Sequence, residues 1–180
     1  DKLRGIVEVD ECFIGGKERN KHEHKKLKAG RGSVGKTAVV GLRERGGRTV
    51  AMPIEATDMA ALQSAVHANV EVGSTIFTDE ATGYVGLDGL FFRHEAINHT
   101  AGNYSENGVS TNSIESVWAV LKRGVYGVYH QVSKKHLHRY VDEFTFRLNV
   151  GNVSRHTLER LDSFVVAVIG KHLTYKELTA

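Results

Sequence analysis

The feature that most constrains this chain is a strand-like run near its start that contains acidic residues. Residues 5–14, Gly-Ile-Val-Glu-Val-Asp-Glu-Cys-Phe-Ile, are rich in β-branched and aromatic side chains, and Gly15 and Gly16 end the run. Because side chains alternate along a strand, Glu8 and Asp10 lie on the same face. So apolar a strand is expected at the centre of a sheet, where an ionised carboxylate is costly unless it is paired or binds a metal. Asp10 therefore has two possible roles: an ion pair with a nearby Lys or Arg, or ligation of a metal ion.

Length and composition favour a single globular core. The chain has 180 residues, of which 41% are hydrophobic, which suits one sizeable core better than two. It contains neither the ~20-residue apolar run of a membrane span nor a signal peptide, so we expect a soluble, cytoplasmic protein with no membrane partner. The single cysteine, Cys12, excludes an internal disulfide and a Cys-based zinc site. Because the chain begins at Asp1 with a strand close behind, we expect a domain of a longer protein.

Hydrophobic periodicity predicts an α/β fold. Two strand-like runs, residues 37–42 and 48–55, are joined by two glycines and predict a hairpin. A helix is expected after Thr57, its predicted N-cap, and a short strand then ends at Asp79. Residues 91–97 form a weaker strand candidate.

Three stretches with helical spacing follow, at residues 114–121, 137–148 and 158–168. The order of elements predicts a mixed five-stranded sheet flanked by helices, and ribonuclease-H-like folds have this order.

The segment from residue 16 to residue 36 is strongly basic. It holds eight positive residues against two negative ones, Glu18 and Glu23. The positive residues are Lys17, Arg19, Lys21, Lys25, Lys26, Lys28, Arg31 and Lys36. Such an excess is typical of a flexible arm that binds nucleic-acid phosphates, and a merely solvated charge run is the alternative.

Two further acidic residues lie where elements begin or end. Asp79 ends a strand, where ligands concentrate in α/β sheets, although capping of a following helix is equally open. Glu115 follows Asn112 by three residues at a predicted helix start, which is also the spacing of a capping box. Lys122 lies seven residues further, two turns or ~10.5 Å along the same face. This spacing favours a carboxylate for a metal ion and a cation for a phosphate.

Carboxylates from two strands and a helix suit metal-assisted phosphoryl transfer. Their hard oxygen atoms bind Mg2+ or Mn2+, which keep positions open for water and substrate phosphate. Two such ions ~3.5–4 Å apart can stabilise both the attacking and the leaving oxygen. Asp10, in the central strand, is best placed to bridge them.

The residues around these carboxylates resemble a known family. The motifs are Val7-Glu-Val-Asp-Glu11 with Ile14-Gly-Gly-Lys17, Phe77-Thr-Asp79, Thr111-Asn-Ser-Ile-Glu115 with Trp118 and Leu121-Lys-Arg-Gly124, Tyr129-His130, His136-Leu137, and Arg139-Tyr-Val-Asp-Glu-Phe144 with Phe146-Arg147 and Asn149. In them the chain resembles bacterial insertion-sequence transposases of the ISXO-type branch, insertion-sequence family fifteen-ninety-five, from about Gly5 to Asn149.

The resemblance implies a DDE-type transposase that cleaves DNA and transfers strands at insertion-sequence ends. It implies a ribonuclease-H-like catalytic domain over residues 1–150, with residues 151–180 as a C-terminal helical extension packed on it. Asp10, Asp79 and Glu115 would form the acidic triad that holds two Mg2+ or Mn2+ ions, with Lys122 as the basic catalytic residue. The 35 residues between Asp79 and Glu115, and the six between Glu115 and Lys122, are typical of the superfamily.

Two positions near the triad vary in this family. Some members have Asn in the third position, which makes Asn112 a candidate partner of Glu115. Where the group has His before Thr-Asn, this chain has Ser110. If that histidine takes part in the chemistry, its task is unfilled here or passes to His99.

DNA is the expected partner. We expect the DNA backbone to be bound, without reading of sequence, by Lys17, Lys25, Lys26, Lys28, Arg31, Lys36, Lys122 and Arg123. The chain shows no clear recognition helix and no Cys-rich finger, so recognition of the element's ends is expected upstream of Asp1. We also expect a homo-oligomer assembled on DNA and association with the bacterial nucleoid.

Two other classes of protein are the alternatives. Residues 30–37, Gly-Arg-Gly-Ser-Val-Gly-Lys-Thr, match the P-loop pattern of an NTPase. A P-loop opens a helix whose N-terminus holds phosphate, whereas strand formers follow here, so we interpret the match as chance. A non-catalytic DNA-binding protein derived from a transposase would usually lack a triad carboxylate, and all three are present.

Overall fold

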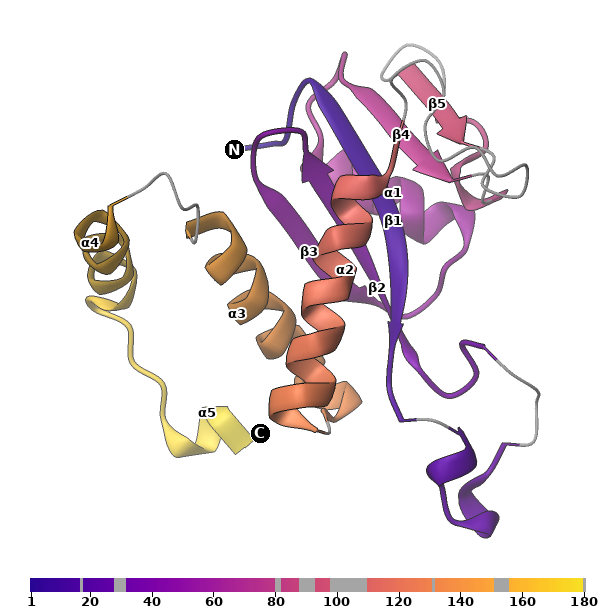
Figure 1. Ribbon diagram of the computed structural model, residues 1–180, viewed down its shortest axis with the longest axis vertical. Coiled ribbons are helices and arrows are strands. Elements are labelled where there is room, and N and C mark those ends of the chain that lie inside the picture. The colour runs from indigo at the N-terminus through magenta and orange to yellow at the C-terminus, as the bar shows by residue number, and fades with distance from the viewer. Residues whose placement is uncertain are drawn as a thin grey trace.

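A five-stranded mixed sheet forms the centre of the fold (Figure 1). The computed structural model describes residues 1–16, 18–27, 32–79, 82–87, 93–97, 110–130, 132–150 and 156–179. The strands are β1 (Ile6–Ile14), β2 (Thr37–Glu44), β3 (Thr49–Ile54), β4 (Thr75–Asp79) and β5 (Arg93–Ile97), in the spatial order β3-β2-β1-β4-β5. The first three strands pair antiparallel, whereas β4 runs parallel to β1 and β5 runs parallel to β4. The predicted α/β class, the mixed sheet and the central place of the first strand are confirmed.

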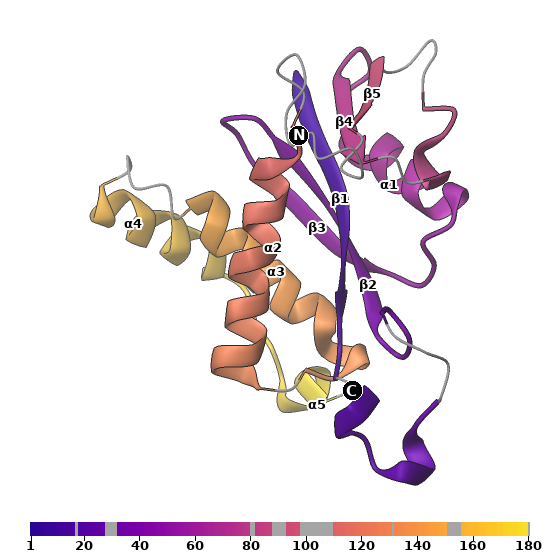
Figure 2. The same cartoon turned by 45° about the vertical axis from the view of Figure 1, so that its right-hand side comes forward.

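Helices cover both faces of this sheet (Figure 2). The α-helices are α1 (Met59–Asn69), α2 (Asn112–Gly124), α3 (Leu137–Val150), α4 (Thr157–Val168) and α5 (Tyr175–Thr179). Short 3-10 turns occur at η1 (Glu18–Asn20), η2 (Glu23–Lys25), η3 (Thr82–Tyr84) and η6 (Lys134–His136), and η5 (Val125–Tyr129) is a π-helical turn that continues α2. No helix in the described part of the chain is long and apolar enough to cross a membrane.

The strand β1 contributes to two separate cores because its side chains alternate. Val7 and Val9 pack with Leu62 and Val66 of α1 on one face. Residues of even number point to the other face, where Cys12 and Ile14 pack with residues of α2 and α3 such as Trp118. Glu8 and Asp10 therefore belong to the α2 face, as the alternation predicted.

Close approach of α2 to the sheet requires a glycine. Gly41 of β2 lies opposite Asp10 of β1. A Cβ atom at Gly41 would lie 2.4 Å from Cη2 of Trp118, well inside van der Waals contact. The absence of a side chain at residue 41 thus allows the indole of Trp118 to lie against the strands beside Asp10.

The first helix begins one residue later than predicted. Asp58, rather than Thr57, is its N-cap, because the Asp58 carboxylate accepts a hydrogen bond from the backbone N–H of Ala61 at 2.9 Å. The prediction of Thr57 was wrong because Asp and Thr are both good caps and the sequence offered both in succession.

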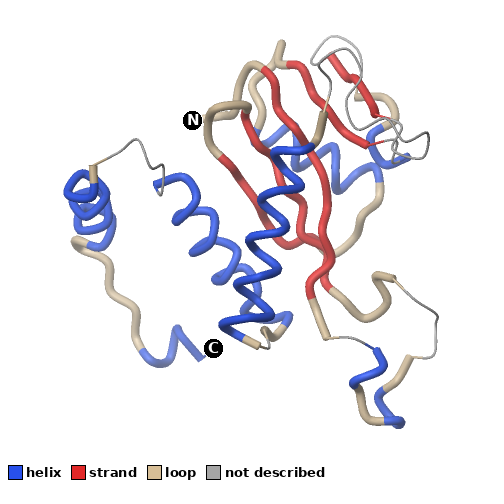
Figure 3. The backbone as a smooth tube through the Cα atoms, in the orientation of Figure 1, coloured by secondary structure: helices blue, strands red, loops and turns tan. Residues whose placement is uncertain are grey.

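The helix α4 lies away from the sheet, on the far side of α3, and α5 lies near the end where α3 begins (Figures 1 and 3). Neither α4 nor α5 has a buried residue. Phe164 of α4 packs against Phe146 of α3, with their ring centroids 6.4 Å apart. Arg139 of α3 donates a hydrogen bond to the carbonyl oxygen of Leu178 in α5 at 2.8 Å. The boundary at residue 150 and the packing of residues 151–180 as an extension of one domain stay predictions.

Candidate active site

The site begins where two parallel strands stop pairing. The ladder between β1 and β4 joins Ile6 to Thr75 and ends at Glu8 and Phe77. Two residues beyond that last pair come Asp10 on β1 and Asp79 on β4. Because side chains repeat every two residues along a strand, Asp10 keeps the face of Glu8 and Asp79 keeps the face of Phe77. Both carboxylates therefore emerge at the point where the strands separate.

A cavity of about 500 Å³ opens at this point. It is lined by Asp10, Glu11, Asp79, Thr111, Glu115, Trp118, Ala119 and Lys122. Strands β1 and β4 supply three of its acidic residues, and α2 with the residue before it supplies the rest. The four residues that the sequence predicted as catalytic, Asp10, Asp79, Glu115 and Lys122, thus come together from three separate elements.

Asp10 is held by two hydrogen bonds. Its Oδ1 accepts from the backbone N–H of Glu11 at 2.8 Å, and its Oδ2 accepts from the indole N–H of Trp118 at 2.9 Å. The pKa of Asp10 is nevertheless raised to about 6, mainly by burial and also by the negative charges of Asp79 and Glu115, while the two donors oppose the rise. The ionised carboxylate is therefore destabilised until a cation joins it.

Glu11 is an acidic residue of the cavity that the sequence analysis missed. Its side chain lies on the opposite face of β1 from Asp10 and accepts a hydrogen bond from the hydroxyl of Tyr84. Burial raises the pKa of Glu11 to about 7; the Tyr84 hydrogen bond opposes that rise, and the charge of Asp10 adds to it. Strand alternation argued against Glu11, but the cavity reaches both faces because β1 and β4 have separated. The signals in the sequence were its place directly after Asp10 and its place at the end of the family motif that begins at Val7.

The capping box that the spacing of Asn112 and Glu115 left open as an alternative does not form. The N-cap of α2 is Thr111, and Asn112 is the first helical residue. The N–H groups of Ser113 and Ile114 donate instead to the carboxylate of Glu8, at 2.9 and 3.0 Å. Glu8 is 105 residues away from Ser113, so no local pattern could have revealed this cap.

Lys122 places a positive charge on the same helix as Glu115. Its side chain is exposed at the cavity. The charge of Lys122 also acts on Cys12, where it opposes the burial that raises the pKa of the thiol to about 12. The thiol of Cys12 is therefore protonated at neutral pH and behaves as an apolar core group.

The donor set of the cavity suits a hard divalent cation. Carboxylate oxygens are the ligands that Mg2+ and Mn2+ prefer, and the pKa of Asp10 is raised first by burial and then by the negative charges of Asp79 and Glu115. As the side chains stand in the described part of the chain, no three His, Cys, Asp or Glu residues converge closely enough to hold an ion. Ion binding therefore requires side chains of the cavity to move closer together.

The predicted DNA-binding residues lie in several places. Lys25 is exposed on the segment between β1 and β2, which projects away from the sheet, and Lys26 there pairs with Glu23 at 2.7 Å (Figure 2). Lys36 is half-buried just before β2. The predicted DNA-binding residues Lys17, Lys28 and Arg31 lie outside the described residues, and so does His99, the candidate for the histidine task near the triad.

The P-loop-like segment leads into β2, which begins at Thr37. The described residues thus place a strand where a phosphate-binding loop requires a helix.

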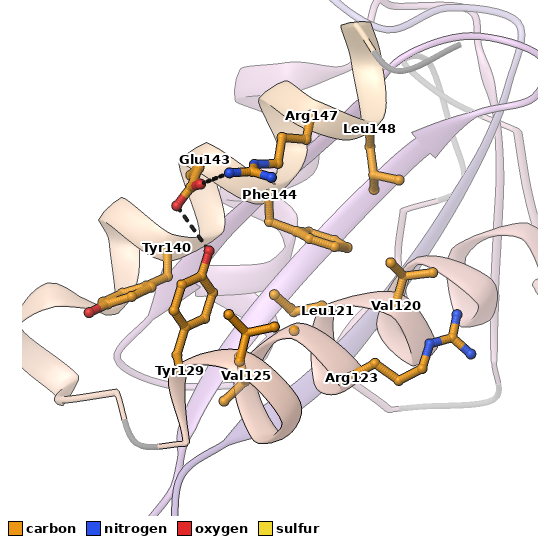
Figure 4. A pocket seen from close by; sticks show the side chains of 12 residues that line it. Val120, Leu121, Arg123, Val125, Tyr129, Tyr140, Glu143, Phe144, Arg147 and Leu148 are labelled. Carbon is orange, nitrogen blue, oxygen red and sulfur yellow. Dashed lines mark hydrogen bonds and ion pairs between the residues drawn. The ribbon is translucent and has the colours of Figure 1, made fainter. Parts of the chain in front are cut away.

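A second, larger cavity lies elsewhere and has a different character. It measures about 610 Å³ and lies between α2 with η5 and α3 (Figure 4). Its walls are mostly apolar, and Arg123 lines it rather than the acidic cavity. Glu143 accepts hydrogen bonds there from Tyr129 at 3.1 Å and from Arg147 at 2.6 Å (Figure 4). The acidic cavity, although smaller, is the one whose side chains can perform chemistry.

Comparison with known proteins assigns the family. The sequence model of the family described as ISXO2-like transposase domain matches residues 2–149. The match covers most of the chain and includes every residue of the acidic cavity, so the chain belongs to this transposase family. A search of curated proteins found no match.

Proposed function

We propose that the chain is the catalytic domain of a DDE-type transposase, which cleaves DNA and joins strands at the ends of an insertion sequence. The observation that carries the proposal is the acidic cavity, where Asp10, Asp79 and Glu115 meet beside Lys122 within a chain of a transposase family.

A ribonuclease-H-like fold is part of this proposal. Its support is the order of the strands: three antiparallel strands, a crossover helix, and two more strands parallel to the first. Carboxylates in the middle of β1, at the end of β4 and on a helix packed across them are the arrangement that the proposed chemistry needs.

Asp10, Asp79 and Glu115 are the residues that would hold the two divalent ions. When bound, Mg2+ or Mn2+ would supply a Lewis acid for the phosphate and a water of lowered pKa as nucleophile. Trp118 holds the Asp10 carboxylate through its indole N–H, which fixes the direction of the second oxygen. Lys122 contributes a positive charge for a phosphate oxygen of the DNA. Glu11 adds a fourth carboxylate at the edge of the cavity.

The basic segment between β1 and β2 is assigned to the DNA backbone, together with Lys122. Lys and Arg side chains there neutralise phosphates and give affinity without sequence reading. We assign recognition of the element's ends to a part of the protein outside this domain. We also propose that several copies assemble on the DNA.

The test is cleavage of DNA that carries the element's ends, with Mg2+ or Mn2+, by the full-length protein. Asp10→Asn, Asp79→Asn and Glu115→Gln should each reduce cleavage by orders of magnitude while leaving DNA binding in place. Glu55→Gln is the matched control, because Glu55 is an exposed carboxylate that pairs with Lys134 and does not line the cavity. Full cleavage by the Asp10 or the Asp79 variant would show that these carboxylates are not the catalytic residues.

The alternative is a transposase-derived protein that binds DNA without cutting it. Binding of the ends by the parent protein with no cleavage under any divalent ion would favour that alternative.

A further inference from the structure

Glu8 is a buried acidic residue whose oxygens are all engaged. Its side chain is 1% exposed, on the same face of β1 as Asp10. One oxygen accepts three hydrogen bonds from the start of α2: from the N–H of Ser113 at 2.9 Å, from its hydroxyl at 2.7 Å, and from the N–H of Ile114 at 3.0 Å. A negative charge at the N-terminus of a helix is stabilised by the helix dipole and by these donors.

Arg45 binds the other oxygen of Glu8. Its Nε donates to Glu8 Oε1 at 2.9 Å, and its Nη2 donates to both the carbonyl oxygen and the hydroxyl of Ser110, at 3.0 and 2.8 Å. The guanidinium also lies over the ring of Phe77, 4.9 Å from its centroid. Arg45 therefore connects β1, β4 and the segment that enters α2.

Three residues of this network lie two residues before a carboxylate of the cavity. Glu8 precedes Asp10, Phe77 precedes Asp79, and Ser113 precedes Glu115.

We propose that Glu8 and Arg45 are positioning residues, which hold the three carboxylates within reach of common ions. The inference rests on the proposed function. Three like charges in one cavity repel, and the two strands no longer pair beyond Glu8 and Phe77. The Glu8–Arg45 pair ties together the two strands and the helix that carry these charges, immediately before the carboxylates. It also takes the capping role that the sequence offered to Glu115.

The chain has a natural reporter for this test. Trp118 is the only tryptophan, and its indole N–H is bonded to Asp10. Tb3+ is a hard, oxygen-seeking ion whose emission is excited through a tryptophan close by, so a Tb3+ titration, with Mg2+ as competitor, measures ion affinity at Asp10 directly. Asp10→Asn should abolish the emission that Mg2+ competes away.

The variants are Glu8→Gln and Arg45→Gln. Loss of a partner that orients metal ligands typically costs 10–100-fold in metal affinity. We expect each variant to need at least about 10-fold more Tb3+ for half-saturation, with emission regained at saturation. The double variant should need little more Tb3+ for half-saturation than the weaker-binding single variant, because the two residues act as one unit.

The control for lost stability is Val66→Ala, in the core on the opposite face. It should lower the melting temperature and leave the Tb3+ midpoint unchanged. If Glu8→Gln does not fold, Arg45→Gln decides, because Arg45 is about one-third exposed, at 32%. A midpoint equal to that of the parent in the folded variants overturns the positioning role. Absence of competed emission in the parent chain would instead overturn the proposed metal site.

Discussion

The pKa of Asp10 leads to a prediction about stability without metal. Burial and two negative neighbours raise this pKa from an ordinary 3.8 to about 6. A carboxyl whose pKa is higher in the folded state stabilises the fold when protonated, and that stability is lost as the pH rises from about 4 through about 6. The shift of about 2 units corresponds to about 3 kcal/mol as an upper figure, because each unit is worth about 1.4 kcal/mol.

The perturbation is Asp10→Asn, which stays neutral at every pH. The two oxygens of Asp10 accept from the N–H groups of Glu11 and Trp118, so the NH2 group of the new Asn side chain must face one of these donors. The resulting loss of unfolding free energy does not depend on pH. Relative to the variant, the parent chain should therefore lose about 2–3 kcal/mol of unfolding free energy between about pH 4 and about pH 7 in EDTA.

The measurement is urea unfolding followed by far-UV circular dichroism across this pH range, with Glu55→Gln as the exposed-carboxylate control. Mg2+ added at neutral pH should restore stability to the parent chain and not to the Asn variant. A difference between Asp10→Asn and the parent that does not vary with pH would refute the reasoning.

Three further outcomes are expected. Replacing the lysines Lys25, Lys26 and Lys28 with Ala should weaken binding about equally on all duplexes and reduce the salt slope by about 1 for each DNA phosphate that is no longer neutralised; weaker binding to one sequence alone would contradict this. Gly41→Ala should cost about 1–3 kcal/mol of stability and shift the fluorescence of Trp118, because the added Cβ overlaps the indole; unchanged stability would contradict it. Removal of residues 156–179, none of them buried, should leave the melting temperature nearly unchanged, and a fall of many degrees would show that α4 and α5 support the core.

Local periodicity was enough to predict the elements of the fold. The strands at the start of the chain and the helix of Trp118 follow from side chains that repeat every two residues or every three to four. The sequence predicted a mixed sheet, and the parallel pairing of β1 with β4 across a crossover helix is the form that the structure gives it. The helix caps were less predictable. Thr57 and Asp58 are both good candidates for the N-cap of α1, and the start of α2 is capped by the distant Glu8.

The triad came from family motifs, whereas its surroundings could not be read from the sequence. The cap of α2 by Glu8 joins residues 105 and 106 positions apart. The place of Glu11 in the cavity depends on where the pairing of β1 with β4 ends. Both are consequences of tertiary contacts, and no spacing in the chain encodes them.

Glu8 and Asp10 show how two acidic residues on one face of one strand acquire opposite effects on stability. Glu8 has Arg45 and the start of α2 as partners, so its charge supports the fold. Asp10 lies beyond the last pair of the β1–β4 ladder and faces two other carboxylates, so its charge opposes the fold until a cation arrives. In EDTA at neutral pH, Glu8→Gln should therefore lower the unfolding free energy by about 3 kcal/mol, the usual loss when a buried pair keeps only one partner. Asp10→Asn should leave it unchanged or raise it. Equal losses in the two variants, measured by urea unfolding, would mean that the two carboxylates do the same structural work and that Asp10 is not held ready for an ion.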